Sequence, residues 1–244
     1  MTFDSKGTPP MPRSGSSQDS KRPRFSILSR LPSREHIAHS AWVAVAVSLW
    51  FMLVYGGCDW ITSQHTYRFD LASSWEKAIP FYPAASLIYL SIYLLFLFIP
   101  FMLPSIQEVN RLGLAIAVMI GISSIGFLLL PGHPIPHPNV VGAWTDLFHV
   151  ADFMNLSHNY LPSLHVGLAV ATVSAINRNA SFVTAACFWT WALLVALSTL
   201  ILHQHYLIDV VTGWFLAIIC IRFFFNRWQE IPVLSQDSSP TPPT

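Results

Sequence analysis

Charged side chains are scarce in this sequence. Asp, Glu, Lys and Arg together make up 10% of the residues, whereas a soluble domain usually carries about 25%. Hydrophobic residues make up 53%. This balance excludes an ordinary soluble domain and indicates a protein that lies largely in the lipid bilayer. The net charge of +1 gives no sign of a nucleic-acid partner, and none is expected.

Cysteine is rare as well. Cys58, Cys187 and Cys220 each lie in or beside an apolar segment. They have neither the spacing of a metal site nor the pairing of a disulfide framework. We interpret them as small buried apolar residues. The sequence predicts no metal and no cofactor.

Long apolar runs, by contrast, are abundant between two polar tails. The six runs are 41–58, 81–103, 112–130, 161–176, 182–202 and 207–225. A helix that crosses a bilayer needs about 20 residues. The runs therefore predict an all-α, polytopic membrane protein with six transmembrane helices, of which the fourth is short and must start close to the interface. We expect a membrane domain over 37–228 and disordered cytoplasmic tails at 1–36 and 229–244.

The distribution of basic residues predicts the orientation in the membrane. Seven of the 13 Lys and Arg precede residue 35, and segments expected on the same side hold four more. The opposite side holds only Arg68 and Lys77. Because cytoplasmic loops are enriched in Lys and Arg, both termini are predicted to be cytoplasmic. The loops 59–80, 131–160 and 203–206 then lie outside, and the last two carry six of the ten histidines.

The first segment with catalytic potential opens the fourth span. Pro162 is typical of the first position of a helix. The amides of Ser163, Leu164 and His165 would then be free donors at the positive end of that helix, where a phosphate binds. Ser163 adds a hydroxyl group, and His165 can protonate a leaving oxygen. The alternative is a capped helix start with an incidental histidine.

The second segment opens the sixth span. His205 and Asp209 are four residues apart and so share one helix face. A carboxylate beside an imidazole fixes its tautomer and leaves the other ring nitrogen free to attack. The alternative is that Asp209 only caps the helix at the interface. Since both spans begin at the outer face, the two segments together suit phosphoryl transfer through a phosphohistidine.

Both segments resemble motifs of the PAP2 superfamily of type 2 phosphatidic acid phosphatases. The tetrapeptide Pro-Ser-Leu-His at 162–165 is similar to the PSGH motif. Ser198 and Thr199, followed by five residues, His205, three residues and Asp209, are similar to the motif SR-x5-H-x3-D. The resemblance covers about residues 40–225 and implies a PAP2-like helical bundle.

The resemblance also implies roles for these residues. His205 would be the nucleophile, Asp209 its orienting partner and His165 the general acid. Ser163 would hold a phosphate oxygen, beside the amide of Leu164. The superfamily generally acts on lipid-linked phosphates at the non-cytoplasmic surface, which agrees with the orientation predicted from charge.

Three cations of the family pattern are missing. Its first motif, K-x6-RP, fits best at Leu130 and His137-Pro138, where both the Lys and the Arg are absent, and Thr199 replaces the Arg of the third motif. A guanidinium holds phosphate with paired hydrogen bonds, so other groups must take over. The candidates are His133, His137, His203, Lys77 and Arg68.

The expected activity is a membrane-embedded lipid phosphate phosphatase. The residues at 162–165 and the HYxxD element at 205–209 resemble the motifs of the branch that contains inositol phosphorylceramide synthases and sphingomyelin synthases. A head-group phosphotransferase is therefore one alternative, and a non-catalytic membrane relative is another. A transporter is disfavoured because the spans hold almost no charge. The expected partners are a lipid phosphate or phospholipid substrate and the bilayer, with no obligate protein partner.

Overall fold

The computed structural model describes residues 31–226, except 134, 141 and 157, and this part of the chain is all helix and loop without a strand. The all-α prediction is thus confirmed. The helices are α1 (Arg34–Phe51), α2 (Gly57–Ser63), α3 (Ser86–Met102), α4 (Ile106–Leu129), α5 (Thr145–Met154), α6 (Leu164–Ile176), α7 (Phe182–Ile201) and α8 (Leu207–Cys220). One π-helix, Met52–Gly56, joins α1 to α2, and another, Ile221–Asn226, extends α8. The predicted tails lie largely outside the described residues.

Five of these helices are long and apolar enough to cross a membrane. They are Arg34–Ser63, Pro83–Met102, Ile106–Leu129, Phe182–Ile201 and Leu207–Asn226. The helix α6 has only 13 residues, which correspond to about 20 Å at 1.5 Å per residue, against about 30 Å for a hydrocarbon core. The fold is therefore that of a membrane protein, and the count of six spans stays a prediction.

Serine caps set the starts of four helices. In each case the side chain accepts a hydrogen bond from an amide in the first turn, as is typical of an N-cap. The caps are Ser33 on α1, Ser105 on α4, Ser163 on α6 and Ser181 on α7. The prediction that Pro162 occupies the first helical position is wrong, because α6 begins at Leu164 and Pro162 precedes the cap.

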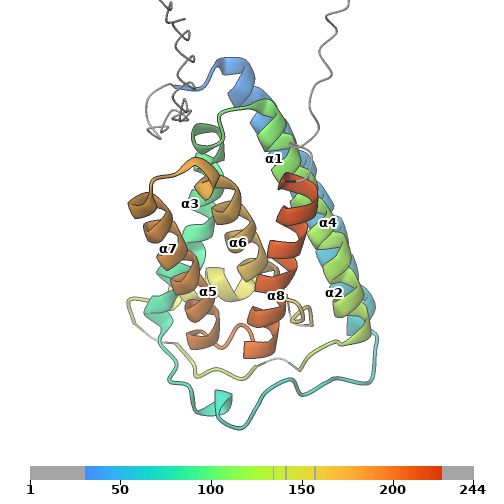
Figure 1. Cartoon of the computed structure of the whole chain (residues 1–244). Helices are drawn as coiled ribbons and strands as arrows, with labels where there is room; N and C mark the ends of the chain where they lie inside the picture. Colours follow the sequence, from blue (N-terminus) through green and yellow to red (C-terminus); the bar gives the residue numbers. More distant parts are fainter. Residues whose placement is uncertain (1–30, 134, 141, 157, 227–244) are drawn as a thin grey trace, which may run out of the picture.

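The helix α6 is the centre of the bundle. Ten of its 13 residues are buried, and it packs against α4, α7 and α8 (Figure 1). Small residues allow this close approach, as in other membrane helices. A Cβ atom placed on Gly213 of α8 would lie 2.3 Å from the carbonyl oxygen of Ser163. The crossing of α6 and α8 therefore depends on a glycine.

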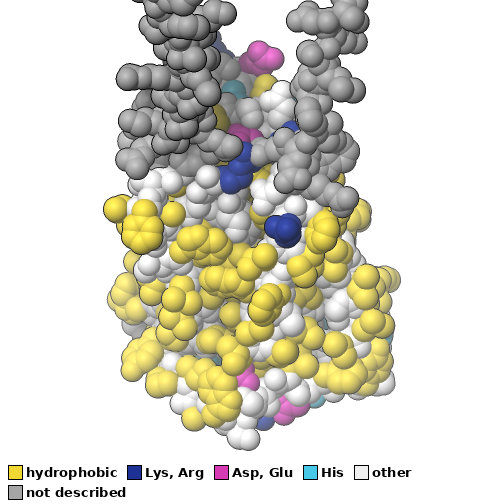
Figure 2. Space-filling model, in the orientation of Figure 1, with side chains coloured by type: hydrophobic (Ala, Val, Ile, Leu, Met, Phe, Trp, Pro, Cys, Tyr) yellow, Lys and Arg dark blue, Asp and Glu magenta, His cyan; other side chains and the backbone are white. Residues whose placement is uncertain are grey.

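The outside of the bundle is apolar over its middle. Figure 2 shows hydrophobic side chains spread across the visible face, with charged side chains toward the two ends. Large rings such as Trp42 and Phe182 are 74% and 87% exposed, which is costly in water and favourable in lipid. The start of α1 and the end of the chain's described part lie at one end, and the starts of α6 and α8 lie at the other (Figure 1).

Candidate active site

The starts of α6 and α8 lie side by side, so the two segments singled out in the sequence meet. The amide of Ser163 donates a hydrogen bond of 2.9 Å to the carbonyl oxygen of Asp209. The expectation of a free amide at Ser163 is therefore wrong. The amides of Leu164 and His165 occupy the first two helical positions, where an amide has no acceptor within its own helix.

His205 and Asp209 form a buried pair. Nδ1 of His205 lies 3.5 Å from Oδ2 of Asp209, and the side chains are 1% and 0% exposed. Oδ2 also accepts a 2.9 Å hydrogen bond from the amide of Tyr206. Nδ1 of His205 and Oδ1 of Asp209 have no hydrogen-bond partner among the described residues. The carboxylate thus faces the ring at a distance that a small movement can close.

The end of α7 positions His205. The carbonyl oxygen of Thr199 accepts hydrogen bonds from the amides of Gln204 and His205, at 2.9 and 3.2 Å. His203, which precedes both residues, has a φ of 54°, a left-handed conformation that often ends a helix. The Thr199 hydroxyl donates within α7 to Ala196, so this residue does not replace the arginine of the family motif.

His165 lies against α3. Its ring stacks on Tyr89 with a centroid distance of 3.8 Å and an angle of 8°. Its Nε2 lies 2.8 Å from the Tyr89 carbonyl oxygen. A carbonyl oxygen can only accept, so Nε2 carries a proton and Nδ1 is the nitrogen left for other contacts. Ser163 is 1% exposed, and its hydroxyl caps Val166 at 3.4 Å.

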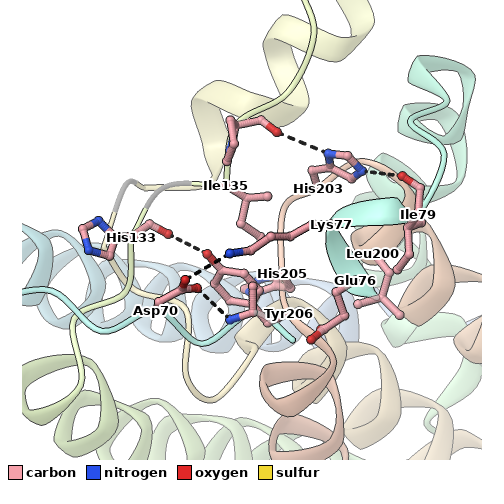
Figure 3. A pocket seen from close by; sticks show the side chains of 12 residues that line it. Asp70, Glu76, Lys77, Ile79, His133, Ile135, Leu200, His203, His205 and Tyr206 are labelled. Atoms are coloured by element: carbon pink, nitrogen blue, oxygen red, sulfur yellow. Dashed lines mark hydrogen bonds and ion pairs between the residues drawn. The ribbon is translucent and has the colours of Figure 1, made fainter. Parts of the chain in front are cut away.

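A pocket of about 290 Å³ opens beside His205. Three segments line it: the loop between α2 and α3, the loop after α4, and the link from α7 to α8 (Figure 3). The lining residues are Asp70, Ala72, Glu76, Lys77, Ile79, His133, Ile135, Pro136, Leu200, His203, His205 and Tyr206. His205 is thus the one residue of the predicted catalytic set in this lining, since neither His165 nor Asp209 contributes to it.

The pocket separates the candidate cations into two groups. Lys77, His133 and His203 line it. His137 does not: its Nε2 lies 3.5 Å from Asp152 on α5. Arg68 does not either, because its guanidinium donates to the carbonyl oxygens of His65 and Tyr67. The structure therefore brings three of the five candidates to His205.

His203 bridges the two loops of the pocket wall. Its Nδ1 lies 3.3 Å from the carbonyl oxygen of Pro136, and its Nε2 lies 3.0 Å from that of Ile79. Through these two contacts His203 ties the loop between α2 and α3 to the loop after α4.

Tyr206 contributes a neutral hydroxyl. It donates 3.1 Å to the carbonyl oxygen of His133. Burial raises the pKa of Tyr206 to about 12, and the negative charges of Asp70, Asp209 and Glu76 act in the same direction. The hydroxyl therefore stays protonated at neutral pH and holds the loop after α4 onto the start of α8.

The helix α5 was missed by sequence reasoning, which expects only a loop at 131–160. It buries Phe148 and Ala151, three residues apart, and this spacing is the signal that could have found it. Oδ1 of Asp152 accepts from Nε2 of Gln204, and Asn155 donates to the Gln204 carbonyl oxygen, both at 3.0 Å. The residue before His205 is thereby held from two sides.

Glu76 caps the start of α8 from the loop between α2 and α3. Its carboxylate accepts from the amide of Leu207 and from Ser73. Burial acts to raise the pKa of Glu76, but these hydrogen bonds outweigh it and hold the pKa below its usual value. An ionised carboxylate at a helix N-terminus is stabilising.

Replacing Glu76 with alanine should lower the free energy of unfolding by about 0.5–2 kcal/mol, the range for loss of a helix cap. Because the folded-state pKa is depressed, this stabilisation is present above the ordinary pKa of about 4.3 and is lost as the pH falls through the folded value. Thermal unfolding in detergent at several pH values checks both points. Glu35→Ala, an exposed carboxylate in the first turn of α1, is the control, and an equal loss in both variants would contradict the cap.

Residues 111–231 match the model of the PAP2 superfamily. The match covers just under half of the chain, from α4 to beyond α8, and includes His165, His205 and Asp209. Members of the PAP2 superfamily are generally membrane phosphatases or phosphotransferases, and the match therefore supports an enzyme of this type. No curated protein matches the chain.

The PAP2 match begins after the loop between α2 and α3. Lys77 and the other pocket residues of that loop therefore lie outside the matched segment. The match is to the superfamily as a whole and does not distinguish among its branches.

Proposed function

We propose that this protein is a lipid phosphate phosphatase that works through a phosphohistidine on His205. The observation that carries the proposal is the buried His205–Asp209 pair, which borders a pocket at the joined starts of α6 and α8. Both residues lie within the PAP2-matched segment, and their resemblance to the third motif of the family supports a catalytic role. The pocket lies at the face predicted to be outside, with both termini in the cytoplasm.

The reaction has two steps. Nε2 of His205 attacks phosphorus, the bond from phosphorus to the lipid oxygen breaks, and the doubly protonated form of His165 gives its Nδ1 proton to that oxygen while Nε2–H stays on the Tyr89 carbonyl oxygen. Water then loses a proton to His165 and attacks the phosphohistidine, which releases phosphate and restores His205. Asp209 orients the ring through Nδ1 and stabilises its positive charge in the intermediate. The lone pair that attacks is therefore on the nitrogen that faces away from Asp209.

A head-group phosphotransferase is the second candidate. The pocket holds the carboxylates of Asp70 and Glu76 and one Lys. Negative charges repel a phosphate monoester dianion more than a diester, which carries one charge fewer. In this case a lipid alcohol takes the place of water in the second step.

The test is a phosphorus NMR assay of products. Purified full-length protein and its His205→Ala variant receive phosphatidic acid, isoprenyl pyrophosphate, or phosphatidylinositol with ceramide. Free phosphate that depends on His205 supports the phosphatase, and a new phosphodiester lipid supports the transferase. Absence of any His205-dependent product from every substrate would favour the non-catalytic reading.

The role of His165 has its own prediction, because its ring lies against Tyr89 rather than in the pocket lining. A general acid matters when the leaving group is a poor one. His165→Ala should therefore slow hydrolysis of an alkyl phosphate about 100-fold, but of a nitrophenyl phosphate only about tenfold or less, since nitrophenolate leaves without a proton. The ratio of the two rates in each variant is the measurement. Equal losses on both substrates would assign His165 to structure instead of proton transfer.

A further inference from the structure

Among the described residues that line the pocket, Lys77 is the one Lys or Arg. It lies in the short 3-10 helix Glu76–Ala78, in the loop between α2 and α3. Figure 3 shows it reaching into the space shared with His133, His203 and His205. A cation is thus placed in the pocket by a segment that the family match does not include.

The segment that carries Lys77 is fixed at two places. The amide of Phe69 donates to the carbonyl oxygen of Pro131, and the amide of His133 donates to that of Phe69, at 2.9 and 3.1 Å. Further along, Glu76 accepts from the amide of Leu207 on α8. Lys77 follows directly after this second anchor. Its backbone position is therefore set by the fold.

The ammonium group of Lys77 forms an ion pair with Asp70. Nζ of Lys77 lies 3.1 Å from Oδ2 of Asp70, with side chains 62% and 58% exposed. The hydrogen bond from Lys77 is the main cause that lowers the pKa of the Asp70 carboxyl, so the partner is an anion. An exposed ion pair of this kind contributes little to stability. An arriving phosphate can therefore take over the lysine at small cost.

We propose that Lys77 is the phosphate-binding cation of this site and that Asp70 is an internal competitor which the substrate phosphate displaces. The inference rests on the proposed function, for which it supplies the missing positive charge. The lysine ammonium is a compact charge on a flexible stem, so it can move from the carboxylate to a phosphate in the same pocket.

The two partners predict opposite effects. Lys77→Gln should raise both the KM for a lipid phosphate and the Kd for inorganic phosphate about tenfold, as expected for loss of one charge-assisted hydrogen bond. Asp70→Asn should lower both constants about two- to fivefold, because it frees the lysine from an exposed ion pair. A purely structural ion pair would give changes of the same sign in both variants.

Arg68→Gln is the matched control. It removes one positive charge from the same loop, and the Arg68 guanidinium lies outside the pocket lining. It should leave KM and Kd within about twofold of the wild-type values, because the guanidinium is held by backbone carbonyl oxygens outside the pocket lining and its charge is partly screened there. Equal effects of Arg68→Gln and Lys77→Gln would reduce the inference to net charge and overturn it.

Phosphate binding is measured by phosphorus NMR on the full chain in detergent. This measurement separates the test of Lys77 from the test of the proposed function. If no substrate is turned over but Lys77→Gln still weakens phosphate binding, the proposed reaction fails and the binding site stands. If turnover depends on His205 while Lys77→Gln binds phosphate as tightly as wild type, the inference fails and the proposed function stands. The inference is also overturned if KM and Kd change in the same direction in Lys77→Gln and in Asp70→Asn.

Discussion

Replacing His205 with alanine should lower the rate of phosphoryl transfer at least ~100-fold, to the background of the assay. The reason is that His205 is the pocket-lining histidine that pairs with a buried carboxylate, Asp209, so the other histidines of the lining lack the partner that would activate them. Release of phosphate from phosphatidic acid measures the loss. A phosphoryl group trapped on wild-type protein, stable to alkali and labile to acid, should be missing from the variant.

Two substitutions of Asp209 separate its charge from its role as a cap. Asp209→Ala removes both, and should cost at least ~100-fold in rate together with some stability. Asp209→Asn keeps an oxygen that can accept from the amide of Tyr206, so the helix start is retained while the charge that faces His205 is lost. The rate of Asp209→Asn should therefore be about as low as that of Asp209→Ala, whereas its unfolding temperature should be close to that of the wild type.

His149→Ala is the control for both residues. His149 is an exposed histidine on α5 outside the pocket lining, so its loss should leave the rate unchanged. Near-normal activity of His205→Ala or of Asp209→Asn would remove that residue from the mechanism. Comparable losses in His149→Ala would show that the assay reports general damage to the protein.

The pairing of the two motif segments could be predicted because it depends on short-range rules. The four-residue spacing correctly predicts that His205 lies near Asp209, although the expected shared helix face is wrong, because His205 precedes the N-cap Tyr206 of α8. The apolar runs also place the starts of the fourth and sixth helices at the same end. The hydrogen bond from the Ser163 amide to the Asp209 carbonyl oxygen could not be predicted in this way, because it depends on the close approach of α6 and α8.

The loop between α2 and α3 could not be placed from the sequence. The bond from Glu76 to Leu207 joins residues 131 positions apart, and no periodic pattern encodes such a contact. Charge alone left Lys77 as one of five candidate cations. The fold then selects among them, because Arg68 and His137 are engaged elsewhere while Lys77 faces the pocket.

Helix boundaries were predicted less well than helix identity. The first apolar run ends at residue 58, yet α2 continues to Ser63, since a helix can continue beyond its apolar part. The helix α5 was missed because its sequence alternates Asp146, His149 and Asp152 with apolar residues over only 10 positions. Such a short helix is held by its contacts with the bundle more than by propensity.

Gly213→Ala should have the second large effect, on both stability and rate. The added Cβ would lie 2.3 Å from the carbonyl oxygen of Ser163 and 3.1 Å from its carbonyl carbon. Because these atoms belong to the backbone, α6 and α8 must move apart. Overpacking of this kind typically costs about 1–3 kcal/mol in the free energy of unfolding.

The same movement separates the groups that the reaction needs together. Ser163 and His165 lie on one side of the crossing, and His205 and Asp209 lie on the other. A displacement of about 1 Å between reacting groups can cost about 100-fold in rate. The rate of phosphate release and the unfolding temperature should therefore fall together in Gly213→Ala, although the side chain of His205 is unchanged in this variant.

Gly57→Ala is the matched control for this crossing. Gly57 is helical as well, but a Cβ placed on it meets no atom within 4 Å. An alanine in such an open helical position should be neutral or stabilise the helix by about 0.5–1 kcal/mol. If Gly213→Ala behaved like Gly57→Ala in both unfolding and rate, the close contact between α6 and α8 would not be what aligns the two halves of the site.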